Sequence, residues 1–477
     1  MRLAALALLA LAPAALAQTA GQRLWSVDVR TTTVGGYADM SQPAVAPDGT
    51  VYLVTDSLYA ISPAGERLWT APASMSEVSL GADGTVYAAA ANTVYAYAPD
   101  GTQRWAFTES PAGFGVLRGP TVGPDGNVYV VTTNGGLGIF SLTPGGALRW
   151  NVPGVSVQGF FPVDRLAFGP DNLYFADENV PGCGPSLSSG LVSVSLDGTI
   201  EWCRVISGVF GQATGARATR DGRAIVWQNA LPDQYLRAYT PEGDLDWSRT
   251  FLPSDVGVGP DNTLYAWHDE TALVSLTADG VQRWRVVQPL TNFPWRAEVS
   301  PDAATVVAGS VYGFGQNGAI VAADAADGHT LWSLPVTGPS AGAGAPAAFS
   351  PDGQVAYVPV NTVSFDEPDQ LWAIQVRDAR PSATEPAADA PGLVLATPSP
   401  NPARGVVRIG LTLGAAAHVR AVVVDALGRE VAALHDGPLA AGAHAFTLDA
   451  SRLAAGVYTV RTVAGTAAAT RRLVVAR

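Results

Sequence analysis

Residues that could do chemistry are few in this chain of 477 residues. The densest polar group is segment 268–270 (HDE), which could hold a metal ion or exchange protons. It falls between two apolar strands and is typical of a solvated hairpin turn. Segment 366–369 (DEPD) could bind Ca²⁺, although runs of charge usually face water. None of the five His residues has metal-ligand spacing with another, so we predict no catalytic, cofactor-binding or metal-binding residue.

The most distinctive polar segment is 176–190, which interrupts a repeating pattern described below. Long loops on a rigid scaffold are where binding residues usually lie. Asp177, Glu178 and Asn179 are therefore candidate binding residues. The alternative is a variable surface loop without function.

The chain has two cysteines, Cys183 and Cys203. If the protein is exported, a disulfide between them would close a loop of about twenty residues and stabilise the fold by roughly 3 kcal/mol. The alternative is two free thiols, because the sequence does not show whether their Cα atoms lie close enough.

Export is predicted by the first residues. Segment 1–17 has a basic residue at Arg2, then an apolar stretch, and ends with an A-x-A cleavage site before Gln18. This is typical of a secretory signal peptide, and the alternative is a buried N-terminal helix.

Two short motifs repeat along most of the chain and indicate the elements of the fold. A Gly followed by three residues and a Trp occurs eight times. The tryptophans are Trp25, Trp69, Trp105, Trp150, Trp202, Trp247, Trp284 and Trp332. Between them, a turn of the Pro-Asp-Gly type followed by an alternating strand also occurs eight times.

One repeat therefore predicts four short strands and two turns. A single sheet of this size cannot bury both faces, but sheets arranged around an axis can, which predicts a β-propeller with blades of ~40 residues. The first strand, 21–29, has no turn motif before it, so it should pair with 369–376 and complete the last blade. We predict eight blades, with seven as the alternative if one unit is an insertion.

These motifs resemble the pyrroloquinoline-quinone-like β-propeller repeat over residues 18–378. In that family the repeated Trp docks neighbouring blades, which implies the same role for the tryptophans above. The resemblance implies the fold and not the cofactor. Quinoprotein dehydrogenases have adjacent cysteines and a Ca²⁺ site that have no counterpart here, so neither the quinone nor Ca²⁺ is expected.

A second domain follows a linker rich in Pro and Ala at 379–397. Residues 398–477 alternate strands and turns in the pattern of a small immunoglobulin-like β-sandwich. They resemble the type A C-terminal sorting domain of the type IX secretion system, and an ordinary ligand-binding module is the alternative. The matching residues include Pro400, Asn401, Pro402, Asp425, Gly428, Arg429, Gly456 and Tyr458.

Bulk composition limits the functions to consider. The net charge of −13 argues against nucleic-acid binding, and no apolar run after the first twenty residues could span a membrane. We expect a monomer, secreted or attached to the cell surface, that is handled by the type IX machinery.

The leading hypothesis is a non-enzymatic binding or scaffold protein for a surface protein or polysaccharide. The alternative is a secreted enzyme, either a quinoprotein dehydrogenase or a polysaccharide-degrading enzyme. Strand-start residues such as 42–47 and 345–351 should line the channel, and because they are mostly small or apolar they favour binding.

Overall fold

In the computed structural model the chain forms two compact units, which join between residues 378 and 379. The structure describes residues 19–29, 40–73, 77–108, 116–133, 138–153, 166–178, 189–207, 213–229, 234–250, 253–268, 272–289, 296–310, 318–336, 341–362, 368–378, 393–396, 398–401, 403–424, 430–454, 456–464 and 467–476. The predicted signal peptide lies outside these residues. No helix among them is long and apolar enough to cross a membrane.

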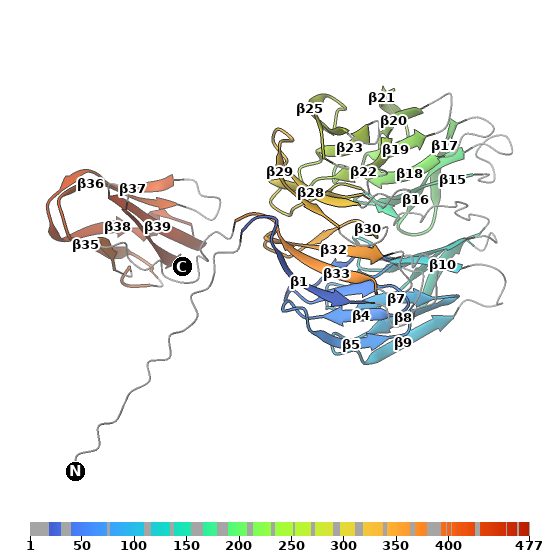
Figure 1. Ribbon diagram of the computed structural model, residues 1–477, viewed down its shortest axis with the longest axis horizontal. Coiled ribbons are helices and arrows are strands. Elements are labelled where there is room, and N and C mark those ends of the chain that lie inside the picture. The colour runs from blue at the N-terminus through green and yellow to red at the C-terminus, as the bar shows by residue number, and fades with distance from the viewer. Residues whose placement is uncertain are drawn as a thin grey trace, which may run out of the picture. The chain divides into compact units, whose positions relative to one another are not determined.

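The first unit consists of antiparallel sheets (Figure 1). In the described residues, seven of them take four consecutive strands each. The first four of these sheets are β2 (Ala44–Val45), β3 (Val51–Val54), β4 (Leu58–Ile61), β5 (Arg67–Ala71); β6 (Ser79–Leu80), β7 (Val86–Ala90), β8 (Thr93–Tyr97), β9 (Gln103–Thr108); β10 (Val116–Val122), β11 (Val128–Thr133), β12 (Ile139–Leu142), β13 (Leu148–Val152); and β14 (Ala167–Phe168), β15 (Asn172–Glu178), β16 (Ser189–Ser195), β17 (Ile200–Ser207). The next three are β18 (Ala213–Ala218), β19 (Ala224–Asn229), β20 (Gln234–Tyr239), β21 (Leu245–Arg249); β22 (Pro253–Val258), β23 (Leu264–His268), β24 (Ala272–Leu276), β25 (Gln282–Val287); and β26 (Glu298–Val299), β27 (Thr305–Gly309), β28 (Ala319–Asp324), β29 (Thr330–Pro335).

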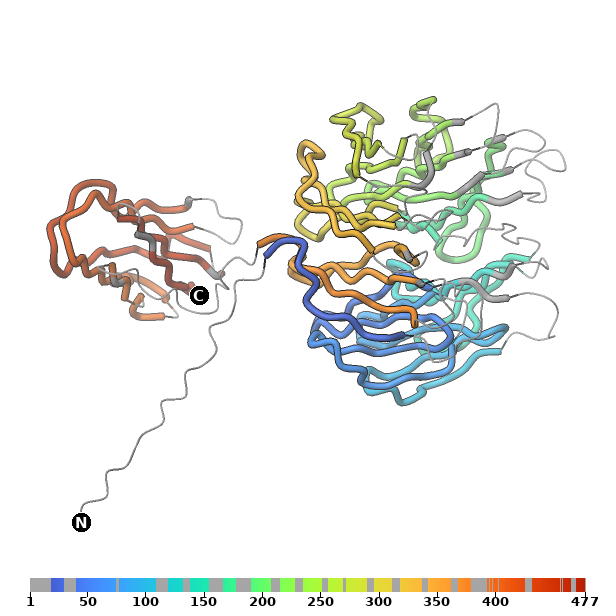
Figure 2. Tube along the Cα trace, in the orientation of Figure 1, coloured from blue at the N-terminus to red at the C-terminus, as the bar shows by residue number. Residues whose placement is uncertain are grey.

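One further sheet joins the two ends of this unit. It contains β30 (Ala341–Ala343), β31 (Ala348–Phe349), β32 (Val355–Thr362) and β33 (Gln370–Gln375), and its outermost strand is β1 (Arg23–Asp28). β1 pairs antiparallel with β33, as the order of the motifs predicts. In Figure 2 the blue N-terminal strand lies beside the orange end of the first unit. Strand pairing therefore closes the unit into a ring.

The repeated turns form where the Pro-Asp-Gly motifs predict them. In the turn that joins β2 to β3, Gly49 has a φ of +86°, a conformation that favours glycine. The carboxylate of Asp48 accepts a hydrogen bond from the backbone N–H of Thr50 at 2.9 Å. The Asp48 side chain therefore stabilises the turn by bonding to its backbone, and β3 begins directly after Thr50.

The core lies between neighbouring sheets and not within any one of them. All four residues of β3 and of β4 are buried, because each of these strands is covered on both faces. One hydrophobic cluster contains Tyr52 and Val54 from β3 together with Val86 and Ala88 from β7. Sheets that share a core in this way stabilise each other and form a rigid support.

The second unit has two sheets and one core. The strands of the first sheet are β34 (Leu393–Leu395), β35 (Val406–Leu413) and β38 (Gly442–Asp449); those of the second are β37 (Glu430–Leu439), β36 (Ala417–Val424), β39 (Gly456–Ala464) and β40 (Ala467–Val475). A short 3₁₀ helix, η1 (Ala450–Arg452), follows β38. The cluster includes Ile409 of β35 and Val460 of β39, so side chains from both sheets form it.

Strand β34 lies inside the segment that we expect to be linker, 379–397. Leu393 and Leu395 are buried in the core of the second unit, and β34 pairs with β35. The composition of the segment hides this strand because its three apolar residues follow a long run of Ala and Pro.

Candidate functional site

The repeated tryptophans lie on the outermost strand of each sheet of the first unit and contact the next sheet. Each indole N–H donates a hydrogen bond to a backbone carbonyl of that sheet. The acceptors are Pro63 for Trp25 (2.9 Å), Pro99 for Trp69 (2.8 Å), Pro144 for Trp105 (2.8 Å), Leu196 for Trp150 (3.1 Å), Pro241 for Trp202 (2.7 Å), Ala278 for Trp247 (2.8 Å), Ala325 for Trp284 (3.2 Å) and Val376 for Trp332 (2.7 Å).

The glycine of each motif receives the Trp of the repeat before it. At Gly146, which has a φ of +87°, an added Cβ would lie 2.6 Å from Cδ2 of Trp105. The same arrangement recurs from Gly65, which faces Trp25, to Gly328, which faces Trp284. The Trp partner of these glycines is not predicted from the sequence. The constant spacing of Gly and Trp is the sequence signal for this contact. Within one motif, the Gly contacts the Trp of the sheet before it, and the Trp contacts the Gly of the sheet after it.

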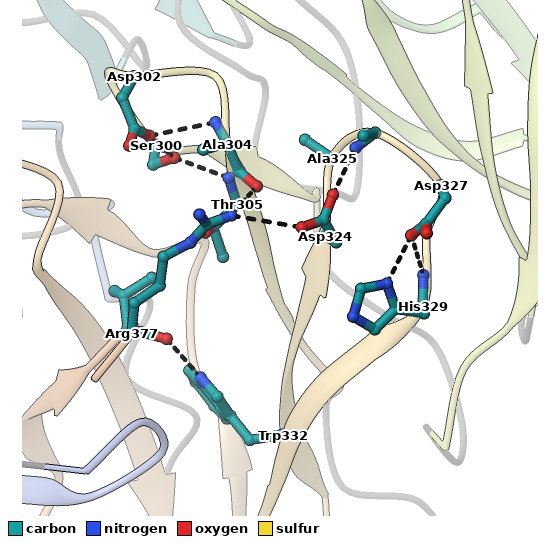
Figure 3. Close-up of polar contacts among 12 residues, drawn as sticks. Ser300, Asp302, Ala304, Thr305, Asp324, Ala325, Asp327, His329, Trp332 and Arg377 are labelled. Carbon is teal, nitrogen blue, oxygen red and sulfur yellow. Dashed lines mark hydrogen bonds and ion pairs between the residues drawn. The ribbon is translucent and has the colours of Figure 1, made fainter. Parts of the chain in front are cut away.

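The last of these contacts closes the ring (Figure 3). Trp332 of β29 donates to the carbonyl of Val376, and a Cβ on Gly21 would lie 3.0 Å from its Cγ. Next to it, Arg377 Nε donates to Thr305 Oγ1 at 2.6 Å, and Arg377 Nη2 lies 3.6 Å from a carboxylate oxygen of Asp324. Sheet β26–β29 therefore contacts both ends of the first unit.

Charged side chains stabilise the turn between the first two strands of a sheet, as the turn between β6 and β7 shows. Asp83 accepts hydrogen bonds from Thr85 Oγ1 (2.6 Å), from the Thr85 N–H (3.0 Å) and from Arg104 Nη1 (2.7 Å). The Thr85 hydroxyl is the main cause that lowers the pKa of Asp83 to about 2, and Arg104 adds to it. The Asp83 carboxylate therefore holds a turn, and its lowered pKa does not suit it to proton transfer near neutral pH.

The sheet β18–β21 has the opposite arrangement of charges. Asp246, directly before Trp247, lies 3.0 Å from Arg223 Nε, whereas Arg104 occupies the position before Trp105. Arg223 also lies 3.0 Å from Asp279 in the next sheet. In both sheets the residue before the Trp forms an ion pair with the turn between the first two strands, but the acidic and basic partners are interchanged. This indicates that these charges support the fold.

Polar side chains lie at the start of two sheets, just before β2 and at β26. Arg296 is 8% exposed, and its Nε lies 2.5 Å from Glu298 Oε1 on β26. Its Nη2 donates to Gln42 Oε1 at 2.8 Å, and Gln42 Nε2 donates to the carbonyl of Ala347. These polar residues are exceptions among strand starts that we expect to be mostly small or apolar. Contacts across more than 250 residues of sequence have no signature in a local pattern.

The candidate binding segment is only partly described. Asp177 and Glu178 lie at the end of β15, where they pair with Gly190 and Ser189, so the strand extends further than the expected loop boundary. Regular antiparallel pairing continues there because nothing in the register interrupts it. Asn179 lies outside the described residues, so its role stays a prediction.

The cysteine prediction is also untested. Cys203 lies on β17 and packs against the core cluster that contains Leu173 and Val192. Cys183 lies outside the described residues.

The structure describes only part of the two polar segments that could bind a metal ion, 268–270 and 366–369. His268 is the last residue of β23, and 269–270 lie outside the described residues. Asp369 is 1% exposed, so the expectation that segment 366–369 is solvated is wrong at this residue. It directly precedes β33, and its carbonyl accepts a hydrogen bond at 2.8 Å from the N–H of Val29, which follows β1, so it lies where the ends of the two paired strands meet. Among the described residues, no group of three His, Cys, Asp or Glu could hold a metal ion.

Residues of the sorting motif hold the last strand of the second unit. Asn401 Nδ2 donates to the carbonyl of Arg472 at 2.9 Å, and its Oδ1 accepts from the N–H of Val474 at 2.8 Å. Gly456 begins β39, and the Tyr458 hydroxyl donates to the carbonyl of Ala454 at 2.9 Å. Pro400 is exposed beside Asn401. The other motif residues, Pro402, Asp425, Gly428 and Arg429, lie outside the described residues.

Repeated four-stranded sheets, joined by pairing of the first and last strands and by a Trp contact at each step, define a propeller-type repeat protein. The family described as outer membrane protein assembly factor BamB matches residues 13–158 and 217–380. The chain belongs to this family of pyrroloquinoline-quinone-like repeats. The secretion system C-terminal sorting domain matches residues 399–476, so the chain is exported by the type IX system to the cell surface or extracellular space.

One solved structure supports the fold, and a second is similar over most of its length. The C-terminal WD40 domain of Sif2 has a TM-score of 0.52 at 7% identity and covers 75% of this chain and 99% of its own. Virginiamycin B lyase from Staphylococcus aureus has a TM-score of 0.45 at 15% identity, covering 74% of this chain and 98% of its own. The likeness to Sif2 shows the propeller fold alone. Among curated proteins, no sequence matches this chain.

Proposed function

We propose that this protein is a non-enzymatic binding or scaffold protein of the cell surface or extracellular space. Its propeller would hold a protein or polysaccharide ligand after export through the type IX system. The observation that carries the proposal is the ring of sheets docked through Trp and Gly, because the repeated residues serve packing. The polar side chains of Glu298 and Gln42 both bond to Arg296, so they too serve contacts within the fold.

We infer three structural details with it. Each sheet of the first unit is one blade, which gives eight blades. The second unit is an immunoglobulin-like sandwich, supported by two sheets around one core. The repeated tryptophans are blade-docking residues, supported by the eight hydrogen bonds above. We also propose that the propeller binds no cofactor and is monomeric.

A thermal-shift screen of the purified exported protein tests this function. The panel contains pyrroloquinoline quinone with Ca²⁺, other divalent metals, and surface and plant polysaccharides. A specific ligand at a hundredfold its dissociation constant stabilises the fold by about 2.7 kcal/mol. Stabilisation by one polysaccharide, without release of smaller sugars on incubation, supports binding.

Two outcomes contradict the proposal. Stabilisation by the quinone with Ca²⁺ indicates a quinoprotein, and release of sugars from a stabilising polysaccharide indicates a degrading enzyme. If none of the panel stabilises the protein, cross-linking on the cell surface should identify a protein partner, and failure there also contradicts the proposal.

A further inference from the structure

The second unit presents a row of arginines on the outward face of its larger sheet. Arg461 on β39 and Arg472 on β40 are exposed, whereas their neighbours Val460 and Leu473 are buried in the core. Arg420 on β36 is also exposed, with 57% of its side chain accessible. Strand alternation therefore places all three arginines on the face that points away from the core.

The register of the strands aligns them on one diagonal. Arg461 lies opposite Thr470 of β40, so Arg472 is two residues further along that strand. On the other side Arg461 lies opposite Val422 of β36, so Arg420 is again two residues away. Diagonal neighbours of this kind have Cβ atoms about 7–8 Å apart. Three positive charges therefore lie in a row across three adjacent strands.

Little negative charge lies along this row in the described part of the chain. Arg420 lies 3.5 Å from Asp436 at the far end. No ion pair joins Arg461 or Arg472 to a described carboxylate. Three like charges at this spacing repel one another, and an acidic partner would relieve that repulsion.

The charge of the whole second unit differs from that of the rest of the chain. Residues 398–477 contain nine Arg and four Asp or Glu, a formal charge of +5. The full chain has −13, so residues 1–397 contribute −18. A basic domain attached to an acidic body can be steered to an acidic partner that the body itself would avoid.

We infer that the diagonal of Arg420, Arg461 and Arg472 docks on an acidic protein surface of the type IX export machinery. Arginine pairs bidentately with carboxylates and is enriched at protein interfaces. Val422, which is 8% exposed, lies between Arg420 and Arg461 and adds an apolar side chain to this face. The strands of this face carry no Trp, Tyr or Phe that points outward, so the face offers no flat ring for a sugar. The inference rests on export by the sorting domain and is independent of what the propeller binds.

The test is export of the full chain from a host that has the type IX system. The variant R461E/R472E reverses the two arginines of the row that form no ion pair with a described carboxylate. Reversal of charges that face carboxylates weakens association about tenfold or more, so the released fraction should fall by a similar factor while full-length chain accumulates inside the outer membrane. R461K/R472K retains the charge and should keep most of the export.

The matched control is R404E/R452E, which makes the same change in net charge away from the diagonal. Arg404 and Arg452 are exposed and flank strands of the other sheet. Arg452 lies 3.2 Å from Asp449, so the control also removes one exposed ion pair, which contributes little to stability. This control should be released like the wild type. Thermal unfolding of the purified variants checks that both sandwiches fold, and ligand stabilisation of the propeller on the same samples tests the proposed binding role separately.

Three results would overturn the inference. The first is normal release of R461E/R472E. The second is an equal loss of release in R404E/R452E, which would make net charge the cause. The third is loss of binding to an anionic polysaccharide such as polygalacturonate by R461E/R472E with unchanged export, which would assign the face to a polysaccharide.

Discussion

At the scale of single residues, the glycine of each Gly-x-x-x-Trp motif meets two demands at once. Gly146 needs a positive φ for its turn, and it also lies against the ring of Trp105. Gly126 shares only the first demand, because its φ is +77° and nothing lies within 4 Å of an added Cβ. The two glycines therefore separate the cost of the backbone conformation from that of the Trp contact.

We predict that Gly126→Ala lowers the free energy of unfolding by about 1 kcal/mol, the cost of a left-handed conformation for a residue with a Cβ. Gly146→Ala should cost about 2 kcal/mol more, because Trp105 must move and its packing against the next sheet is lost. Urea unfolding of the purified chain measures both. Equal losses in the two variants would show that the Trp contact adds nothing.

At the scale of elements, the turn that joins β6 to β7 is held by the carboxylate of Asp83. The pKa of Asp83 is about 2 in the folded chain, below its ordinary value of 3.8. A lowered pKa stabilises the fold above pH 4, and this contribution is lost as the pH falls towards 2. Because Asp83 is largely exposed, with 62% of its side chain accessible, the contribution is small.

We predict that Thr85→Val raises the pKa of Asp83 towards its ordinary value. The change removes the hydroxyl that donates to Asp83 and keeps the shape of the side chain. Arg104→Gln should raise this pKa less, since Arg104 is a smaller cause of the shift. NMR titration of the carboxyl carbon between about pH 1.5 and 5, the range over which Asp83 ionises, measures its pKa in both variants. A larger effect of Arg104→Gln contradicts the assignment.

At the scale of the whole molecule, the first unit is held by contacts between its two ends. β1 pairs with β33, and the N–H of Ala20 donates to Asp378 Oδ1 at 2.9 Å. Trp332 and Arg377 join the same ends to sheet β26–β29. Without β1 the edge of β33 would be open and available to another strand.

We predict that a chain beginning at residue 30 unfolds at a lower temperature and associates through the edge of β33. A synthetic peptide of residues 19–29 should restore the unfolding temperature and the monomer, because it can supply the missing strand. A peptide with the same composition in scrambled order should do neither. An unchanged, monomeric protein without β1 would mean that ring closure contributes little to stability.

The sequence by itself determined the repeat, the turns and the strands. The Pro-Asp-Gly turns fix where hairpins form, because they depend on residues that are neighbours in the chain. The offset between the turn and Trp motifs determined that segment 21–29 pairs with the end of the unit, and the motifs around Asn401 indicated the sorting domain.

Only the tertiary structure decided which residues meet across sheets. It showed that Trp105 contacts the glycine of the next motif, that Arg296 bonds to Gln42, and that Asp369 is buried. It also aligned Arg461 and Arg472 on one diagonal through the strand register. These contacts depend on how whole sheets pack and on the register between strands. Neither is encoded in the spacing of residues along one strand, because residues distant in the chain create them.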